Sequence, residues 1–186
     1  MSLLAETVVE EYFNYHGYFT IRGLKIGLDE IDLLAVKLSN KNNIECLHIE
    51  VQVSEKPVNY ISHLTEEIRK RHDKKSKTSA IKRTREELIL CVAEWVKKKF
   101  NHPGKKKLRA KLFPNQEWKF MFVHGNIKDR NELDILEKHS VETIDIKILI
   151  HNLSKYYLKK YKTSSIGRDI INLFKLFEVT LDEKKD

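Results

Sequence analysis

The chain has 186 residues, of which 41% are hydrophobic and 33% charged, with a formal net charge of +8. This length suits one domain with a core of its own, and the hydrophobic content argues against wholesale disorder. No apolar stretch reaches the roughly 18–20 residues of a membrane-spanning helix and the N-terminus lacks signal-peptide order, so we expect a single cytoplasmic domain over 1–186 with no membrane partner.

The first part of the chain predicts a helix followed by three strands. Apolar residues at helical spacing indicate a helix over 3–16, which Gly17 ends in the manner of a C-terminal cap. Strands are expected at 18–23, 30–38 and 44–53, where β-branched, aromatic and apolar residues gather. A polar turn between the last two favours a hairpin.

The remaining chain alternates between helical and strand patterns. Helical segments are expected at 60–74 and 79–100, and the Pro- and Gly-containing sequence NHPGKKK at 101–107 predicts a loop. The later elements are a strand at 118–125, a helix at 129–138, a strand at 143–150 and a C-terminal helix that begins near Ser164–Ser165. This order predicts an α/β fold in which helices cover the faces of a mixed sheet.

Two acidic side chains interrupt strands that otherwise have the apolar character of buried strands. Asp32 lies within DEIDLLAVKL and Glu50 within LHIEVQVS. If the two strands pair as a hairpin, both carboxylates can meet at one end of the sheet, where they would repel each other. A divalent cation relieves that repulsion, and Mg²⁺ favours sites with one or two carboxylates. The alternative is that the acids lie at strand ends and pair with Lys or Arg.

The pattern resembles the PD-(D/E)XK nucleases, which have the restriction-endonuclease-like fold, and is closest to the archaeal Holliday-junction resolvase type. The resemblance covers roughly residues 5–54. It rests on Glu6 in the first helix, Gly17–Tyr18 before the first strand, Asp32 within DLLA, and Glu50–Val51–Gln52. It implies a restriction-endonuclease-like mixed β-sheet.

The fold implied by the resemblance has an α-β-β-β-α-β core flanked by helices. In this sequence the motif core would occupy about 3–125, with a C-terminal α/β extension at about 126–180 and extra C-terminal helices. The whole chain would then form a single nuclease-like domain.

Carried over to this chain, the resemblance implies a phosphodiester-hydrolysing site. Asp32, Glu50 and the Val51 carbonyl would bind Mg²⁺ or Mn²⁺, and Glu6 would complete the site through metal or water. Glu10 lies one helical turn further along and competes with Glu6 for that role. The metal would offset charge on the phosphate and lower the pKa of a bound water.

Gln52 departs from the family pattern, because it occupies the position of the usual lysine. An amide orients water but supplies no charge. Lys25, Lys37 or Lys82 are candidates to supply the missing cation, and the sequence does not choose among them. His48 shares a strand face with Glu50, where a hydrogen-bonded structural role competes with contact to metal or substrate.

Positive charge is concentrated in two windows. Residues 69–85 and 97–111 carry +16 together, so the rest of the chain carries −8. This segregation favours a surface that binds a polyanion over solvated lysine-rich faces. The candidate nucleic-acid-binding residues are Lys74, Lys75, Lys77, Lys82, Arg83, Lys105, Lys106 and Lys107.

Together these features predict a metal-dependent DNA endonuclease that acts on duplex or branched DNA and selects its substrate by structure. One alternative is a nuclease-fold protein that has lost catalysis and binds nucleic acid or a protein partner. A further alternative is an RNA-directed nuclease. A homodimer is expected, since two sites suit the cutting of two strands.

Overall fold

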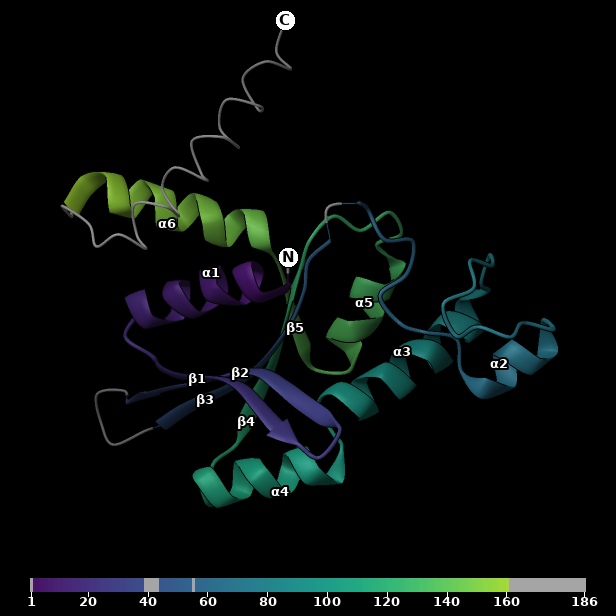
Figure 1. The fold of residues 1–186 in the computed structure, drawn as a ribbon, viewed down its shortest axis with the longest axis horizontal. Helices are drawn as coiled ribbons and strands as arrows, with labels where there is room; N and C mark the ends of the chain where they lie inside the picture. The colour runs from purple at the N-terminus through teal and green to yellow at the C-terminus, as the bar shows by residue number, and fades with distance from the viewer. Residues whose placement is uncertain (1, 39–43, 55, 161–186) are drawn as a thin grey trace, which may run out of the picture.

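The computed structural model describes residues 2–38, 44–54 and 56–160 and contains one five-stranded sheet flanked by helices (Figure 1). The strands are β1 (Phe19–Ile26), β2 (Asp29–Leu38), β3 (Ile44–Gln52), β4 (Trp118–His124) and β5 (Val141–Asp145). The helices are α1 (Ser2–Tyr15), α2 (Glu66–Arg71), α3 (Arg85–Lys99), α4 (Pro103–Leu112), α5 (Asn131–Lys138) and α6 (Ile146–Lys160).

The sheet is mixed, as the sequence predicts. Its strands lie in the order β1-β2-β3-β4-β5, and β1, β2 and β3 form an antiparallel meander. Strands β4 and β5 then add in parallel, as helical connections between parallel strands require. The predicted helix, three strands, helical crossover and fourth strand therefore appear in that order.

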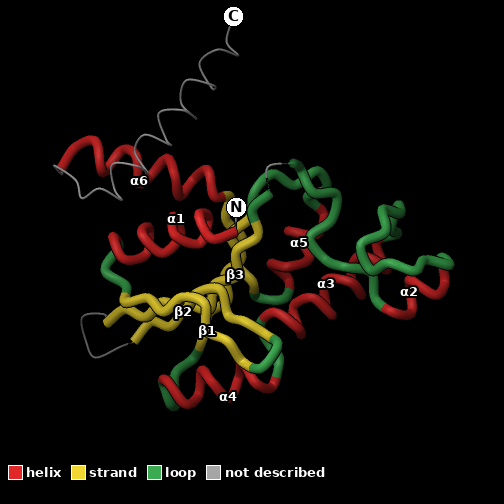
Figure 2. The backbone as a smooth tube through the Cα atoms, viewed as in Figure 1, coloured by secondary structure: helices red, strands yellow, loops and turns green. Residues whose placement is uncertain are grey.

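Helices cover both faces of the sheet (Figure 2). On one face, Val9 of α1 and Leu149 of α6 join Leu33, Ile49 and Val123 of the sheet in a buried apolar cluster. On the other face, residues of α3 and α5 pack against β4 and β5. Alternate side chains of β2 and β3 therefore enter different environments.

The first helix ends where the sequence predicts. Gly17 has a φ of +82°, and the Tyr18 amide donates to the carbonyl of Phe13 at 3.0 Å. This is the left-handed cap geometry that glycine adopts without steric cost.

Two predicted helices are shorter than expected. The segment predicted as a helix over 60–74 is helical only in α2, because the buried Glu132 carboxylate accepts the backbone amides of Ile61 and Ser62 and holds that stretch in an irregular form. The helix predicted over 79–100 begins at Arg85, where Thr84 and Glu87 form a capping box.

The prediction of a loop at 101–107 is correct for 101–102 and wrong for 103–107. Pro103 is the first residue of α4, a position where its missing amide costs nothing and its fixed φ favours the helix. The helix also buries Lys105 and Arg109, which lie on one face four residues apart. Proline and glycine therefore mark the beginning of a helix here.

The strand predicted over 143–150 is partly wrong. Strand β5 ends at Asp145, whose carboxylate accepts the amide of Lys147 at 2.9 Å, and α6 begins at the next residue. Ile146, Leu149 and Leu153 are buried at helical spacing, which outweighs the short alternating pattern.

The predicted C-terminal helix near Ser164–Ser165 lies outside the described residues. Within 2–38, 44–54 and 56–160 the structure has no helix with both the length and the apolar character needed to span a bilayer. Strand β5 extends the same sheet as the proposed motif core, and α5 shares an apolar cluster with α3.

Candidate active site

Asp32 and Glu50 lie where β2 and β3 stop pairing. The last paired residues at this end of the antiparallel ladder are Leu33 and Ile49, so the next position along each strand is Asp32 on β2 and Glu50 on β3. Beyond this point the Val51 amide has no β2 carbonyl to meet, and it donates instead to Asp32 Oδ2 at 2.8 Å. Asp32 thus has a local structural role at the end of the ladder.

The Asp32 carboxyl is electrostatically coupled to Glu50. Burial raises the pKa of Asp32 from its ordinary value of 3.8 to about 7, and the negative charge of Glu50 adds to this rise. The positive charge of Lys99 and the Val51 hydrogen bond act in the opposite direction but do not cancel it. The two acids are therefore close enough to resist joint ionisation, as the sequence predicts.

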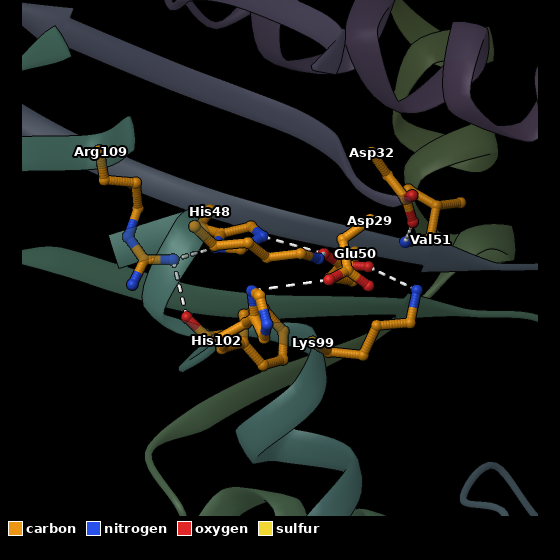
Figure 3. A network of polar contacts seen from close by, with 10 residues as sticks. Asp29, Asp32, His48, Glu50, Val51, Lys99, His102 and Arg109 are labelled. Carbon is orange, nitrogen blue, oxygen red and sulfur yellow. Dashed lines mark hydrogen bonds and ion pairs between the residues drawn. The ribbon is translucent and has the colours of Figure 1, made fainter. Parts of the chain in front are cut away.

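Glu50 is buried, with 1% of its surface exposed, yet it is ionised. Burial alone would raise its pKa, but a hydrogen bond from His48 and the charges of Lys99 and Lys105 lower that pKa to about 2. Lys99 Nζ donates to Glu50 Oε2 at 2.7 Å, and Lys105 Nζ donates to Oε1 at 2.8 Å. His48 and Lys99 approach the carboxylate from opposite sides (Figure 3).

His48 extends this network away from Asp32. Burial is the largest influence on its imidazole and lowers the pKa to about 4, so the ring is neutral at pH 7. Arg109 Nη1 donates to His48 Nδ1, which leaves the proton on Nε2 to be donated to Glu50 Oε1 at 2.9 Å. Arg109 also donates to the Phe100 carbonyl at 2.8 Å. In this structure His48 is a buried, hydrogen-bonded residue, which is the structural role of the two that the sequence offers.

The two lysines that contact Glu50 are not identifiable from the sequence as its partners. Lys99 ends α3 and Lys105 lies in the first half of α4, so each depends on a long-range packing of helix against sheet. The sequence predicts Lys105 in a phosphate-binding loop, but it is 2% exposed and its ammonium is an internal ion-pair partner. The four-residue spacing of Lys105 and Arg109 indicates a shared helical face, but only if 103–112 is a helix, which the sequence pattern did not predict.

None of the three lysines proposed to replace the motif cation contacts Glu50. Lys37 lies over the Tyr18 ring at 5.3 Å, Lys25 pairs in register with Glu30, and Lys82 lines a cavity near Tyr60. Lys99 instead contacts Glu50 at 2.7 Å and is within electrostatic reach of Asp32, and the charges of both acids raise its pKa against the lowering effect of burial.

Glu6 and Glu10, the two candidates on α1, lie in different surroundings. Glu10 Oε2 forms an ion pair with Arg22 Nη1 at 3.3 Å and accepts a hydrogen bond from Thr20. Glu6 is half-buried, and its charge contributes to the raised pKa of Asp32. Glu6 is therefore within electrostatic reach of Asp32, whereas Glu10 is engaged by Arg22 and Thr20.

Gln52 and Val51 lie at the end of β3 beside these acids. The Val51 amide is occupied by Asp32, while the Gln52 carbonyl accepts the amide of Gly125 at 3.1 Å. The Gln52 side chain is half-buried and shares its strand face with Glu50.

The proposed nucleic-acid-binding residues fall into two groups. Arg83 is buried, stacks on Tyr60 at 4.0 Å and donates to the Ser62 carbonyl, so its guanidinium is used internally like the Lys105 ammonium. The exposed members of the set are Lys74, Lys75, Lys77, Lys82, Lys106 and Lys107.

The oxygen atoms of this site could hold a magnesium ion only if Lys99 moved away from Glu50. Among the described residues no three His, Cys, Asp or Glu side chains form a ready-made metal-binding group. Mg²⁺ needs few protein ligands, and Asp32, Glu50, Glu6 and the Val51 carbonyl supply the hard oxygen atoms that it prefers. However, Glu50 Oε2 is occupied by Lys99. Lys99 is 33% exposed and can withdraw into solvent, whereas Lys105 is enclosed.

Comparisons with known proteins add little to this geometry. No protein-family model matches the chain, and no curated protein is similar to it. A solved structure titled as a protein of unknown function, AF1548, shows 10% sequence identity and a TM-score of 0.44, with 94% of this chain and 96% of that chain covered.

Proposed function

We propose that this protein is a Mg²⁺- or Mn²⁺-dependent nuclease of the restriction-endonuclease-like type that hydrolyses phosphodiester bonds in DNA. The observation that carries the proposal is the coupled pair Asp32 and Glu50 at the open end of the β2–β3 ladder, with the Lys99 ammonium in contact with Glu50 and within electrostatic reach of Asp32. This combination of two acids and one cation is what the sequence resemblance requires, except that the cation comes from α3 and not from position 52.

The proposed roles follow from the contacts of each side chain. Asp32, Glu50 and the Val51 carbonyl hold the metal, and Glu6 contributes through metal or water. When bound, the metal supplies charge neutralisation at the phosphate and a water of lowered pKa. Gln52 orients that water through its amide.

Lys99 replaces the cation that Gln52 lacks. Its ammonium is the more exposed of the two that bind Glu50, so it can exchange the carboxylate for a phosphate oxygen. A positive charge directed at the phosphate stabilises the extra negative charge of the transition state. Lys105 stays with Glu50 and keeps that carboxylate ionised and fixed in position.

The charge of the cluster also favours a phosphate ligand. Lys99, Lys105 and Arg109 supply three positive charges around Glu50, while the raised pKa of Asp32 leaves that group only partly ionised at pH 7 and His48 is neutral. The exposed lysines of the two basic windows extend this field over the surface. DNA, duplex or branched, is therefore the proposed partner, bound by a homodimer.

The second candidate function is nucleic-acid binding without catalysis. It is favoured by a specific observation: both oxygens of Glu50 are engaged by Lys99, Lys105 and His48. If Lys99 never leaves Glu50, the site is a buried salt-bridge cluster and cannot accept a metal ion.

Cleavage of supercoiled plasmid separates the two functions. The wild-type protein is expected to nick plasmid with Mg²⁺ or Mn²⁺ and to be inactive in EDTA, whereas Asp32→Asn and Glu50→Gln are expected to be inactive with either ion. Lys99→Met should lower the rate by about 10²-fold or more, the usual scale for a group that stabilises transition-state charge. Glu45→Gln, at the other end of β3 where Glu45 pairs with Lys119, is the matched control.

If the wild-type protein and the variants all bind DNA but none cleaves it with either metal ion, the protein is a nucleic-acid-binding protein and not a nuclease. A rate unaffected by Lys99→Met, in a protein that Asp32→Asn inactivates, would remove Lys99 from the proposed chemistry.

A further inference from the structure

A second cavity lies on the α4 face of the sheet, beside the network that fixes Glu50. It has a volume of about 300 Å³, at the lower end of the range for small-molecule sites. Phe113 at the end of α4 and Trp118 at the start of β4 form one part of its wall, with ring centroids 6.1 Å apart in an edge-to-face arrangement. This gives a small site lined on one side by aromatic rings.

The polar lining is suited to a base attached to a phosphate. Asn101 and Gln116 supply side-chain amides, which can donate and accept hydrogen bonds, and Lys106 supplies an exposed ammonium at the rim. Aromatic rings, amides and a neighbouring cation are the groups that proteins use to bind unstacked bases.

The cavity is connected to the candidate active site through a chain of hydrogen bonds. Arg109 forms part of its lining and donates to His48, which donates to Glu50. The guanidinium is held from a second direction by the Phe120 ring, 5.1 Å away. A ligand in the cavity would therefore lie two side chains away from Glu50, along the face that α4 covers.

We propose that this cavity binds a single unstacked nucleobase of the strand whose backbone passes the Asp32–Glu50 site. The inference rests on the proposed function for its choice of nucleic acid as the ligand. It adds that the protein recognises a base out of its stack, as in a single strand, a flap or a branch point.

The test uses the full chain carrying Asp32→Asn, which prevents cutting, and Trp95→Phe, which leaves Trp118 as the only tryptophan. The probes are a single-stranded DNA of about eight nucleotides, within the usual site size, and an oligomer of equal length whose sugars carry no bases. The base-containing strand is expected to quench Trp118 fluorescence. It should also bind about 5- to 150-fold more tightly than the abasic strand, the range expected for one stacked base.

Two substitutions in the aromatic wall test whether the cavity causes the preference for the base-containing strand. Phe113→Ala should bring the ratio of the two affinities close to one. Trp118→Phe keeps an aromatic ring in place and should lower the ratio. Both affinities are measured by the fluorescence anisotropy of a labelled strand. Lys106→Ala should weaken both strands alike. Phe19→Ala removes an aromatic ring that is 74% exposed on β1 and should leave the ratio unchanged.

If the test protein with an unchanged cavity binds the two strands with equal affinity, the inference is overturned, whatever the cavity variants do. Quenching by free dAMP without quenching by the strand also overturns it, because the base would then come from a mononucleotide. A protein that nicks plasmid but does not discriminate refutes this inference alone. A protein that discriminates between the strands but shows no cleavage with either Mg²⁺ or Mn²⁺ supports the inference and refutes the nuclease.

Discussion

Glu50 keeps a negative charge inside the protein because three donors surround it. Removing an ionised carboxylate from water is costly unless partners and hydrogen bonds compensate. His48, Lys99 and Lys105 provide that compensation at hydrogen-bonding distance. Asp32 has fewer such partners and faces the charge of Glu50, so burial and repulsion raise its pKa to about 7. Neighbouring acids on two paired strands therefore have opposite pKa shifts.

The raised pKa of Asp32 has a consequence for stability. In the folded protein this group holds its proton up to about pH 7, whereas in the unfolded chain it loses the proton near 3.8. The folded state binds more protons between these values, so this contribution is complete below pH 4 and is lost as the pH rises through 7. Asp32→Asn, measured by urea unfolding at several pH values, should make stability fall less steeply over this window, by up to about 1.4 kcal/mol for each step of one in pH.

Glu50 should have the opposite effect on the pH dependence of stability in the same experiment. Its pKa is lowered to about 2 from 4.5, so its contribution is present above pH 4.5 and is lost on acidification through pH 2. A pH dependence between 4 and 7 that is identical in wild type and Asp32→Asn would contradict the raised pKa.

Lys105 tests the buried charge network directly. Lys105→Met should destabilise the protein by about 3 kcal/mol, the lower end for removing one partner of a buried pair, since Lys99 and His48 still contact Glu50. The exposed neighbour Lys106 is the control, and Lys106→Met should change stability by less than about 0.5 kcal/mol. Combining Lys105→Met with Glu50→Gln should recover part of the loss. Equal effects of the two lysine substitutions would show that Lys105 does not carry a buried ion pair.

At the scale of elements, α4 positions the network. Its first turn approaches the end of β1, and a Cβ at Gly104 would lie only 2.9 Å from Ile26 Cγ2. The absence of a side chain at Gly104 therefore lets α4 pack closely enough for Lys105 to reach Glu50. Helix α3 delivers Lys99 to the same carboxylate from its last turn. Two consecutive helices thus converge on one residue of β3.

Gly104→Ala tests this close approach. Alanine within a helix is normally favoured over glycine by roughly 0.5–1 kcal/mol, but here the added methyl overpacks against Ile26, which typically costs about 1–3 kcal/mol. We expect a net loss in the free energy of unfolding, measured by urea titration. The double variant with Ile26→Ala should lose less than the sum of the single changes. A stabilised Gly104→Ala protein would mean that α4 does not pack this closely.

At the scale of the whole molecule, positive charge is concentrated beside an otherwise acidic body. The structure divides that charge into internal partners, Lys105 and Arg83, and exposed lysines in both windows. Only exposed groups can replace the counterions condensed on DNA. The expected DNA-binding surface therefore contains fewer charges than the sequence windows contain.

The salt dependence of DNA affinity measures this division. Replacing Lys106 and Lys107 with Ala should reduce the magnitude of the log–log slope by up to about 1.8, at roughly 0.9 per phosphate contact on duplex DNA. Lys138→Ala, at the end of α5, is the control and should leave the slope unchanged. If the double variant also leaves it unchanged, Lys106 and Lys107 do not contact phosphate.

The sequence by itself determined the first four strands, the two interrupting acids and the segregation of charge, because these depend on local patterns of apolar, polar and charged residues. It also indicated that Asp32 and Glu50 could meet if their strands pair as a hairpin, and the register of β2 and β3 places them at the same end of the ladder. Only the tertiary structure decided which cations neutralise Glu50. Lys99 and Lys105 reach it from helices that lie about 50 residues later in the chain. Proline and glycine at the start of α4 are compatible with either a loop or a helix, and the packing of α4 against the sheet selected the helix.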